Sequence, residues 1–251
     1  MNHPARPLLL VIAHGSRDPR HAATVHALTR RVRSQRPGVR VATAFLDFDA
    51  PTVPRVLERL AAEGVTDVIA LPLLLTRAYH AKHDIPAVLR DASARLPGLR
   101  IRRAGVLGPS PLLLAALERR LWEAGLRPSD RSTTGLVLAA AGSTDPEAGA
   151  VFADTARELR RAGWCAVRPA FASAALPRPD TVVDALRADG CTRVAVSPCV
   201  IAPGRLPDRI ASAAHAADVL AEPLGPSPEL ARLLLTRYDE ARAAAPALRV
   251  G

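Results

Sequence analysis

Short apolar runs alternate along the N-terminal half of the chain with longer stretches in which hydrophobic positions follow a helical period. The apolar runs are rich in Val, Leu and Ile and occupy residues 7–13, 39–46, 67–75 and 101–106. Continuous runs of this kind are typical of strands buried on both faces of a parallel sheet. The amphipathic stretches fill the gaps at residues 19–35, 53–63, 84–95 and 110–123. The alternation predicts an α/β fold in which helices flank a parallel sheet.

The same phrases recur, in the same order, in the C-terminal half. "VIAHGSRDP" (11–19) returns as "LAAAGSTDP" (138–146), "TAFLDFDAP" (43–51) as "PAFASAALP" (169–177), and "VIALPLLLTRAYH" (68–80) as "VAVSPCVIAPGRL" (194–206). The sequence therefore predicts two similar tandem domains, at residues 1–128 and 134–251. The polar, turn-rich segment 126–135 contains the boundary.

Length and composition favour a protein that folds without disulfide bonds. The chain has 251 residues, 49% of them hydrophobic, which is enough for a sizeable core. Its three cysteines are odd in number and lack a CxxC spacing, so they indicate neither a disulfide framework nor a zinc knuckle. No secretory leader or membrane-spanning run is evident, so we expect a soluble, cytoplasmic protein.

The formal net charge of +10 comes almost entirely from arginine, since Lys82 is the sole lysine. A nucleic-acid-binding protein would cluster its cations and interleave aromatic residues. Here arginines alternate with acids along the helices and aromatic residues make up 3% of the chain. Nucleic-acid binding is therefore the weaker alternative, and the positive field is better suited to attracting a small polyanionic substrate.

Groups that can bind a metal or move a proton follow three of the predicted strands. His14 follows the first, Asp47 the second, and His80 with His83 the third. The carboxyl ends of parallel strands form the ligand-binding edge of an open α/β sheet, so these groups are expected to converge. Imidazole and carboxylate together suit iron, cobalt, nickel or zinc.

Each of these residues also has a simpler interpretation. A histidine at a strand end is more often a hydrogen-bonded loop residue, yet the second copy keeps the turn and replaces His14 with Ala141. That exchange favours a site retained in one half and lost in the other. Asp47 and Asp49 could be solvated loop acids or helix caps. The segment 16–18 could form a turn that caps a helix starting at Pro19.

Three segments resemble the signature motifs of the sirohydrochlorin chelatases, the small class II chelatases, in their two-domain form. They are "LLLVIAHGSRDP", "AFLDFDAP" and "LPLLLTRAYHAKHDIP". The resemblance implies two tandem chelatase-like domains with a cleft between them, and insertion of Fe2+ or Co2+ into a tetrapyrrole. The metal is a substrate, and no permanently bound cofactor is implied.

The resemblance also assigns roles to individual residues. It implies that His14 and His80 bind the metal and help to remove pyrrole protons, and that Asp47 assists where relatives usually have glutamate. The corresponding positions of the second half are Ala141, Ser173 and Leu206, so no chemistry is expected there.

The tetrapyrrole substrate is a polycarboxylate, which arginine is suited to bind in a bidentate manner. The residues expected to contact it are Ser16, Arg17, Arg77, Tyr79 and, from the second half, Arg205. Tyr79 could alternatively be a packing residue. We expect the second half to wall the cleft, with no membrane partner, and the chain to be a monomer or weak dimer. The rival interpretation is a histidine-based metal carrier that catalyses no insertion.

Overall fold

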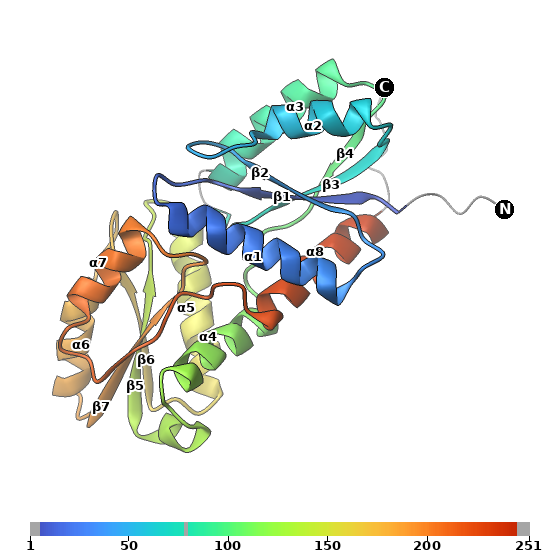
Figure 1. Ribbon diagram of the computed structural model, residues 1–251. Coiled ribbons are helices and arrows are strands. Elements are labelled where there is room, and N and C mark those ends of the chain that lie inside the picture. Colours follow the sequence, from blue (N-terminus) through green and yellow to red (C-terminus); the bar gives the residue numbers. More distant parts are fainter. Residues whose placement is uncertain (1–5, 78–79, 245–251) are drawn as a thin grey trace.

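The computed structural model describes residues 6–77 and 80–244, with only the backbone described at His80 and Ala81. It contains two four-stranded parallel sheets, one in each half of the chain (Figure 1). The predicted fold class, two similar α/β domains with helix-flanked parallel sheets, is confirmed.

The first sheet has the strand order β2-β1-β3-β4. Its strands are β1 (Leu8–Ala13), β2 (Val41–Phe45), β3 (Asp67–Pro72) and β4 (Arg100–Arg103). The helices of this half are α1 (Pro19–Gln35), α2 (Val53–Ala62), α3 (Ile85–Arg95) and α4 (Pro111–Glu123), with a π-helical turn, η1 (His80–Asp84), before α3. Strand β1 is buried along its whole length because it lies between two other strands and under helices on both faces.

The second sheet repeats the arrangement, with the order β6-β5-β7-β8. Its strands are β5 (Thr134–Ala140), β6 (Ala166–Phe171), β7 (Arg193–Pro198) and β8 (Val219–Leu220). The helices are α5 (Pro146–Arg161), α6 (Pro179–Ala188), α7 (Arg205–Ala213) and α8 (Pro228–Ala243), and a 3₁₀ turn, η2 (Pro128–Ser132), links the halves.

One predicted strand differs from expectation. Residues 101–106 were expected to form a buried strand, but β4 covers Arg100–Arg103 and its residues are exposed or half-buried. The reason is its position at the edge of the sheet, where Arg100 and Arg102 reach Asp67 on β3 at 3.4 and 2.9 Å. An edge strand has solvent on one side and therefore accommodates charged side chains.

Helices α1, α4, α5 and α8 form a shared middle layer between the two sheets (Figure 1). The C-terminal helix α8 packs on α1 and β3 of the first half, whereas α4 packs against β7 of the second half. Leu230, Leu233 and Leu234 of α8 belong to the same buried cluster as Leu9 of β1, and the Tyr238 hydroxyl donates to the Pro7 carbonyl at 2.7 Å. One core thus joins the halves, and the division at 1–128 and 134–251 stays a prediction.

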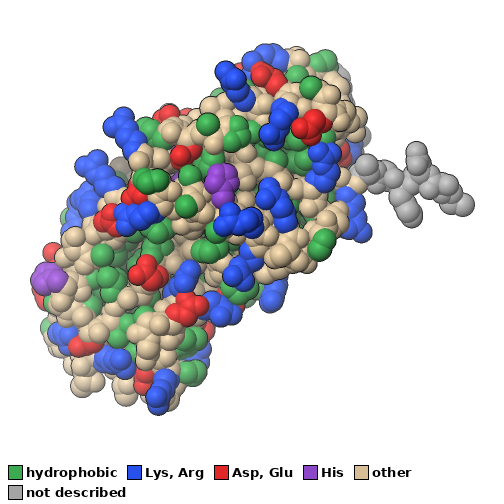
Figure 2. Space-filling view, viewed as in Figure 1, with side chains coloured by type: hydrophobic (Ala, Val, Ile, Leu, Met, Phe, Trp, Pro, Cys, Tyr) green, Lys and Arg blue, Asp and Glu red, His purple; other side chains and the backbone are tan. Residues whose placement is uncertain are grey.

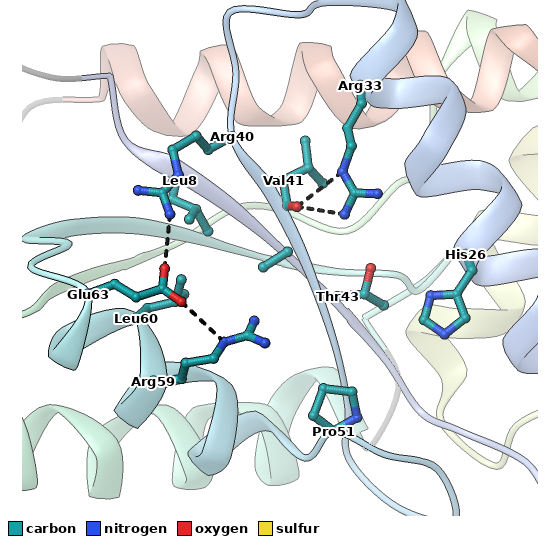
Figure 3. Close-up of a pocket in the computed structure, with 11 residues that line it drawn as sticks. Leu8, His26, Arg33, Arg40, Val41, Thr43, Pro51, Arg59, Leu60 and Glu63 are labelled. Atoms are coloured by element: carbon teal, nitrogen blue, oxygen red, sulfur yellow. Dashed lines mark hydrogen bonds and ion pairs between the residues drawn. The ribbon is translucent and has the colours of Figure 1, made fainter.

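The free edge of β2 borders an arginine-lined groove of about 280 Å³, shown in Figure 3. Arg33 donates to the Val41 carbonyl at 2.7 Å, which occupies an acceptor that the edge strand would otherwise present. Arg40 and Arg59 both pair with Glu63, at 3.0 and 3.6 Å. Arg33 therefore protects the strand edge, and Glu63 offsets the charge of one of the two arginines that it pairs with.

Candidate active site

A cleft of about 930 Å³ lies between the two halves, at the carboxyl end of β1. The first half contributes the loop 14–19 and Phe48, and the second half contributes α7. The cleft-lining arginines are Arg17, Arg205 and Arg209. Elsewhere, on the face shown in Figure 2, basic side chains are spread over both halves and interspersed with acidic ones.

The loop that carries His14 depends on Gly15, whose φ is +96°. A Cβ at this position would collide with the carbonyl oxygen of Asp47. The Asp47 N–H donates to the His14 carbonyl at 2.9 Å, which fastens the β1 loop to the β2 loop. Only glycine combines this left-handed backbone with so close an approach.

The second half repeats this turn without the histidine. Gly142 has a φ of +95°, and a Cβ there would collide with the carbonyl oxygen of Ser173. Asp18 and Asp145 cap α1 and α5 by accepting from the N–H of Arg20 and Glu147, at 2.9 and 3.0 Å. The prediction that the turn persists while His14 becomes Ala141 is confirmed.

His14 is half-buried at the wall of the cleft. Its Nδ1 lies 3.1 Å from the Gly15 carbonyl, so an Nδ1–H that donates there places the lone pair of the neutral ring on Nε2. A backbone carbonyl that orients an imidazole in this way is usual for metal-binding histidines. The ring is therefore oriented as a metal ligand or proton acceptor requires.

Phe48 is a cleft residue that sequence reasoning missed. The residue is 51% exposed, its ring lies 6.0 Å from the His14 ring, and the Arg17 guanidinium lies 5.4 Å from the ring centre. Its φ of +63° is unusual for a residue other than glycine. The second copy has Ala174 in the same conformation, with a φ of +56°, so the aromatic ring is a feature of the first half alone. The signal available in the sequence was "FLDFD" against "FASAA".

The two carboxylates of the β2 loop point to different partners. Asp47 is exposed, does not line the cleft, and accepts from the Phe48 N–H at 2.8 Å. Asp49 accepts from the Ser16 N–H at 2.9 Å and so holds the His14 loop from the side. Neither side chain caps α2, whose N-cap is Thr52. The catalytic role of Asp47 stays a prediction, and Asp49 is the carboxylate that supports the loop.

The remaining candidate residues occupy different places. Ser16, Arg17 and Arg205 line the cleft with His14. Arg77 lies instead in a neighbouring hollow of about 510 Å³ with Lys82 and Arg103.

Tyr79 and the side chain of His80 lie outside the described residues. Within the described part of the chain, no three His, Cys, Asp or Glu side chains are grouped as a ready metal site. His80 as a second metal ligand therefore stays a prediction.

His21 is a second residue that sequence reasoning missed. Its Nδ1 is buried without a hydrogen-bond partner among the described residues. Burial lowers the pKa of His21, the nearby charge of Asp49 opposes that shift, and His14 reinforces it. The second copy has Ala148 at this position, so the extra imidazole belongs to the first half.

The lowered pKa makes His21 a source of acid sensitivity. The unfolded chain takes up a proton near the ordinary histidine pKa of 6.5, but the folded protein does so only at lower pH. Stability should therefore fall as the pH drops below about 6.5. We expect the H21A variant to lose less stability than the parent between about pH 7.5 and about pH 5 in urea unfolding. The H215A variant, which alters an exposed histidine, serves as the control. Equal losses in H21A and the parent would contradict this account.

Two tandem α/β halves meet at a cleft, and the histidine loop is retained only in the first half. The fold and site therefore define a duplicated α/β protein whose candidate site belongs to its first half. The chain belongs to the CbiX family, whose model matches residues 8–124 and again residues 135–241. The two matches correspond to the two repeats found in the sequence.

Curated relatives carry chelatase names. Sirohydrochlorin cobaltochelatase of Priestia megaterium is 26% identical over 204 residues, which are 80% of this chain and 66% of that protein. Sirohydrochlorin ferrochelatase of Bacillus subtilis is 29% identical over 139 residues, which are 55% of this chain and 52% of that protein. The alignments thus span less than two thirds of either relative.

Solved structures share the fold over nearly the whole chain. SirB from Bacillus subtilis with Fe3+ superposes with a TM-score of 0.82 at 24% identity, covering 95% of this chain and 96% of that one. SirB in complex with cobalt gives a TM-score of 0.78 at 22% identity, covering 94% and 95%. Among the helices in the described part of this chain, none is both long and apolar enough to cross a membrane.

Proposed function

We propose that this protein is a sirohydrochlorin chelatase that inserts Fe2+ or Co2+ into the tetrapyrrole. The observation that carries the proposal is the cleft in which His14, Phe48 and three arginines from both halves face one space. The names of the curated relatives agree with it, since they include both a cobaltochelatase and a ferrochelatase.

Insertion exchanges two pyrrole N–H protons for one divalent ion. The ion must shed ligands and the protons must reach a base, and one imidazole can serve either need. His14 is suited to both because its Nδ1 is directed at the Gly15 carbonyl. The exposed Phe48 ring offers a face on which a macrocycle can stack. His80 is proposed as the second ligand and Asp47 as an acid–base assistant.

The arginines of the cleft give it affinity for carboxylates. Asp18 and Asp208 also line the cleft, but both pair with Arg20 at 2.6 Å. Arg20 offsets one of these two negative charges, and the three positive charges of Arg17, Arg205 and Arg209 exceed the one that remains. We propose that these arginines, with Ser16, bind the substrate carboxylates, and that Arg77 and Tyr79 contact the substrate from the third loop.

The R205A variant tests the contribution of the second half to substrate binding. We expect its KM for sirohydrochlorin to rise about tenfold with a smaller change in kcat, because a charge-assisted hydrogen bond is lost. The control is R157A, an exposed arginine of α5 outside the cleft. A KM equal to that of the parent would remove Arg205 from the binding site.

Catalysed metalation separates the enzyme from a metal carrier. Purified protein mixed with sirohydrochlorin and Co2+ or Fe2+ should accelerate the change in absorbance over the uncatalysed rate with many turnovers per chain. A carrier would bind the ion stoichiometrically and leave the rate unchanged.

We further propose that the protein is cytoplasmic and needs no resident cofactor, nucleic acid or membrane. We also propose that it is a monomer or weak dimer, because the second half of the same chain already forms one wall of the cleft.

A further inference from the structure

Two clusters of ion pairs join the halves, one at the cleft and one at the hollow that Arg77 lines. Arg20, at the start of α1, lies 2.6 Å from Asp208 on α7. Lys82, in η1, lies 2.7 Å from Asp145 and 3.0 Å from Glu147 at the start of α5. Each cluster therefore connects the start of the first helix in one half to the segment that follows the third strand of the other.

The two clusters are the same contact with the charges reversed. Arg20 and Glu147 hold equivalent places, since each directly follows the proline that begins its helix. Lys82 and Asp208 lie in the corresponding segments after β3 and β7. The first half carries the cation at both clusters, and the second half carries the anion that each cation reaches in the other half. Arg20 also pairs with Asp18 of its own half at 2.6 Å. The residue types have diverged between the copies, but an attraction between the two halves is present at both places.

In the first half, the two segments that form these ion pairs are the ones next to the proposed metal ligands. The α1 start follows His14 after a four-residue loop, and η1 begins at His80. We propose that Arg20, Asp208, Lys82, Asp145 and Glu147 are positioning residues, through which the second half holds the His14 and His80 segments in register for metal insertion. The inference rests on the proposed chelatase function. It gives the second half a task beyond binding the substrate.

The solvent exposure of these ion pairs limits how much they contribute to the free energy of unfolding. The side chains of Arg20 and Asp208 are 53% and 55% exposed, and those of Lys82 and Asp145 are 33% and 20% exposed. Pairs of this kind add little to global stability and are weakened by salt. Small displacements of catalytic groups nevertheless reduce rates strongly. The clusters should therefore affect kcat more than the free energy of unfolding.

The test uses reversal of one pair in the full chain. R20E should lower kcat about tenfold with little change in KM or in the urea midpoint, because the introduced carboxylate repels both Asp208 and Asp18 and frees the His14 segment. The double variant R20E/D208R should recover kcat to within about threefold. An arginine at position 208 would pair with the introduced glutamate and with Asp18, just as Lys82 pairs with Glu147 and Asp145 in the other cluster. The control is R40E, whose partner Glu63 lies in the same half. In about 1 M salt the difference between parent and R20E should shrink.

A readout independent of activity separates this inference from the function on which it rests. Amide hydrogen exchange in residues 14–19 should be faster in R20E than in the parent, and restored in R20E/D208R. If R20E fails to fold, D208N removes the attraction without adding repulsion and should give the same direction of change. A parent that metalates while R20E and D208N match it in kcat and exchange would overturn the inference. A parent that does not metalate would overturn the proposed function, and exchange would still decide whether the ion pairs hold the loop.

Discussion

Replacing His14 with alanine should lower the kcat of metal insertion by about 10²–10⁴-fold while the protein remains folded. The imidazole is the cleft group directed by a backbone hydrogen bond, at 3.1 Å from the Gly15 carbonyl, and it is absent from the second copy of the turn. Steady-state metalation of sirohydrochlorin with Co2+, followed by absorbance, measures the loss. Circular dichroism and the urea midpoint check that the fold is unchanged.

Two matched variants give this prediction its meaning. H215A removes an exposed histidine just past the end of α7 and should keep the parent rate. A141H places an imidazole on the equivalent turn of the second half and should not rescue H14A, because Phe48 and the proposed His80 have no counterparts there, only Ala174 and Leu206. An H14A variant that metalates at the parent rate would exclude the proposed mechanism.

Substituting Gly15 with alanine should destabilise the protein by about 3 kcal/mol and abolish most activity. A left-handed backbone costs an L-residue about 1–2 kcal/mol, and the added methyl group must displace the Asp47 carbonyl at a further cost of about 1–3 kcal/mol. That displacement also breaks the 2.9 Å bond between the Asp47 N–H and the His14 carbonyl. Urea unfolding measures the first effect and the metalation rate the second.

The equivalent variant in the second half separates stability from catalysis. Gly142 has the same conformation and the same obstructing carbonyl, that of Ser173. G142A should therefore lose a similar amount of stability, but at a temperature where it is still folded it should retain far more activity than G15A. Equal activity in the two variants would mean that the Gly15 turn has no special place in the chemistry.

Local patterns in the sequence were sufficient for most of the architecture. The apolar runs at 7–13 and 67–75 contain the buried strands β1 and β3, the second of which ends at Pro72, because continuous hydrophobic segments are best covered inside a sheet flanked by helices. The repeated GS-DP phrase predicted the same turn twice, since glycine is required for its backbone and aspartate for the helix cap. The replacement of His14 by Ala141 in the second copy indicated that the candidate site belongs to the first half.

Contacts between distant segments were beyond such patterns. Nothing in the order of elements indicates that α8 packs on the first sheet and α4 on the second, because an amphipathic helix specifies an apolar face but not which sheet covers it. Because α8 belongs to the second half but packs on the first, a fragment of residues 1–130 would expose the apolar surface of α1 and β3 that Leu230 and Leu234 help to bury.

The candidate site also has features that the sequence predicted and features that depended on tertiary contacts. The sequence by itself determined that His14 directly follows a buried strand and that the glycine turn comes next. Only the tertiary structure decided that Asp49, and not Asp47, holds the Ser16 amide, and that Arg205 enters the cleft while Arg77 lies in a separate hollow. Side-chain direction in a loop depends on hydrogen bonds and charges supplied by other segments, and these partners are defined only when the chain is folded.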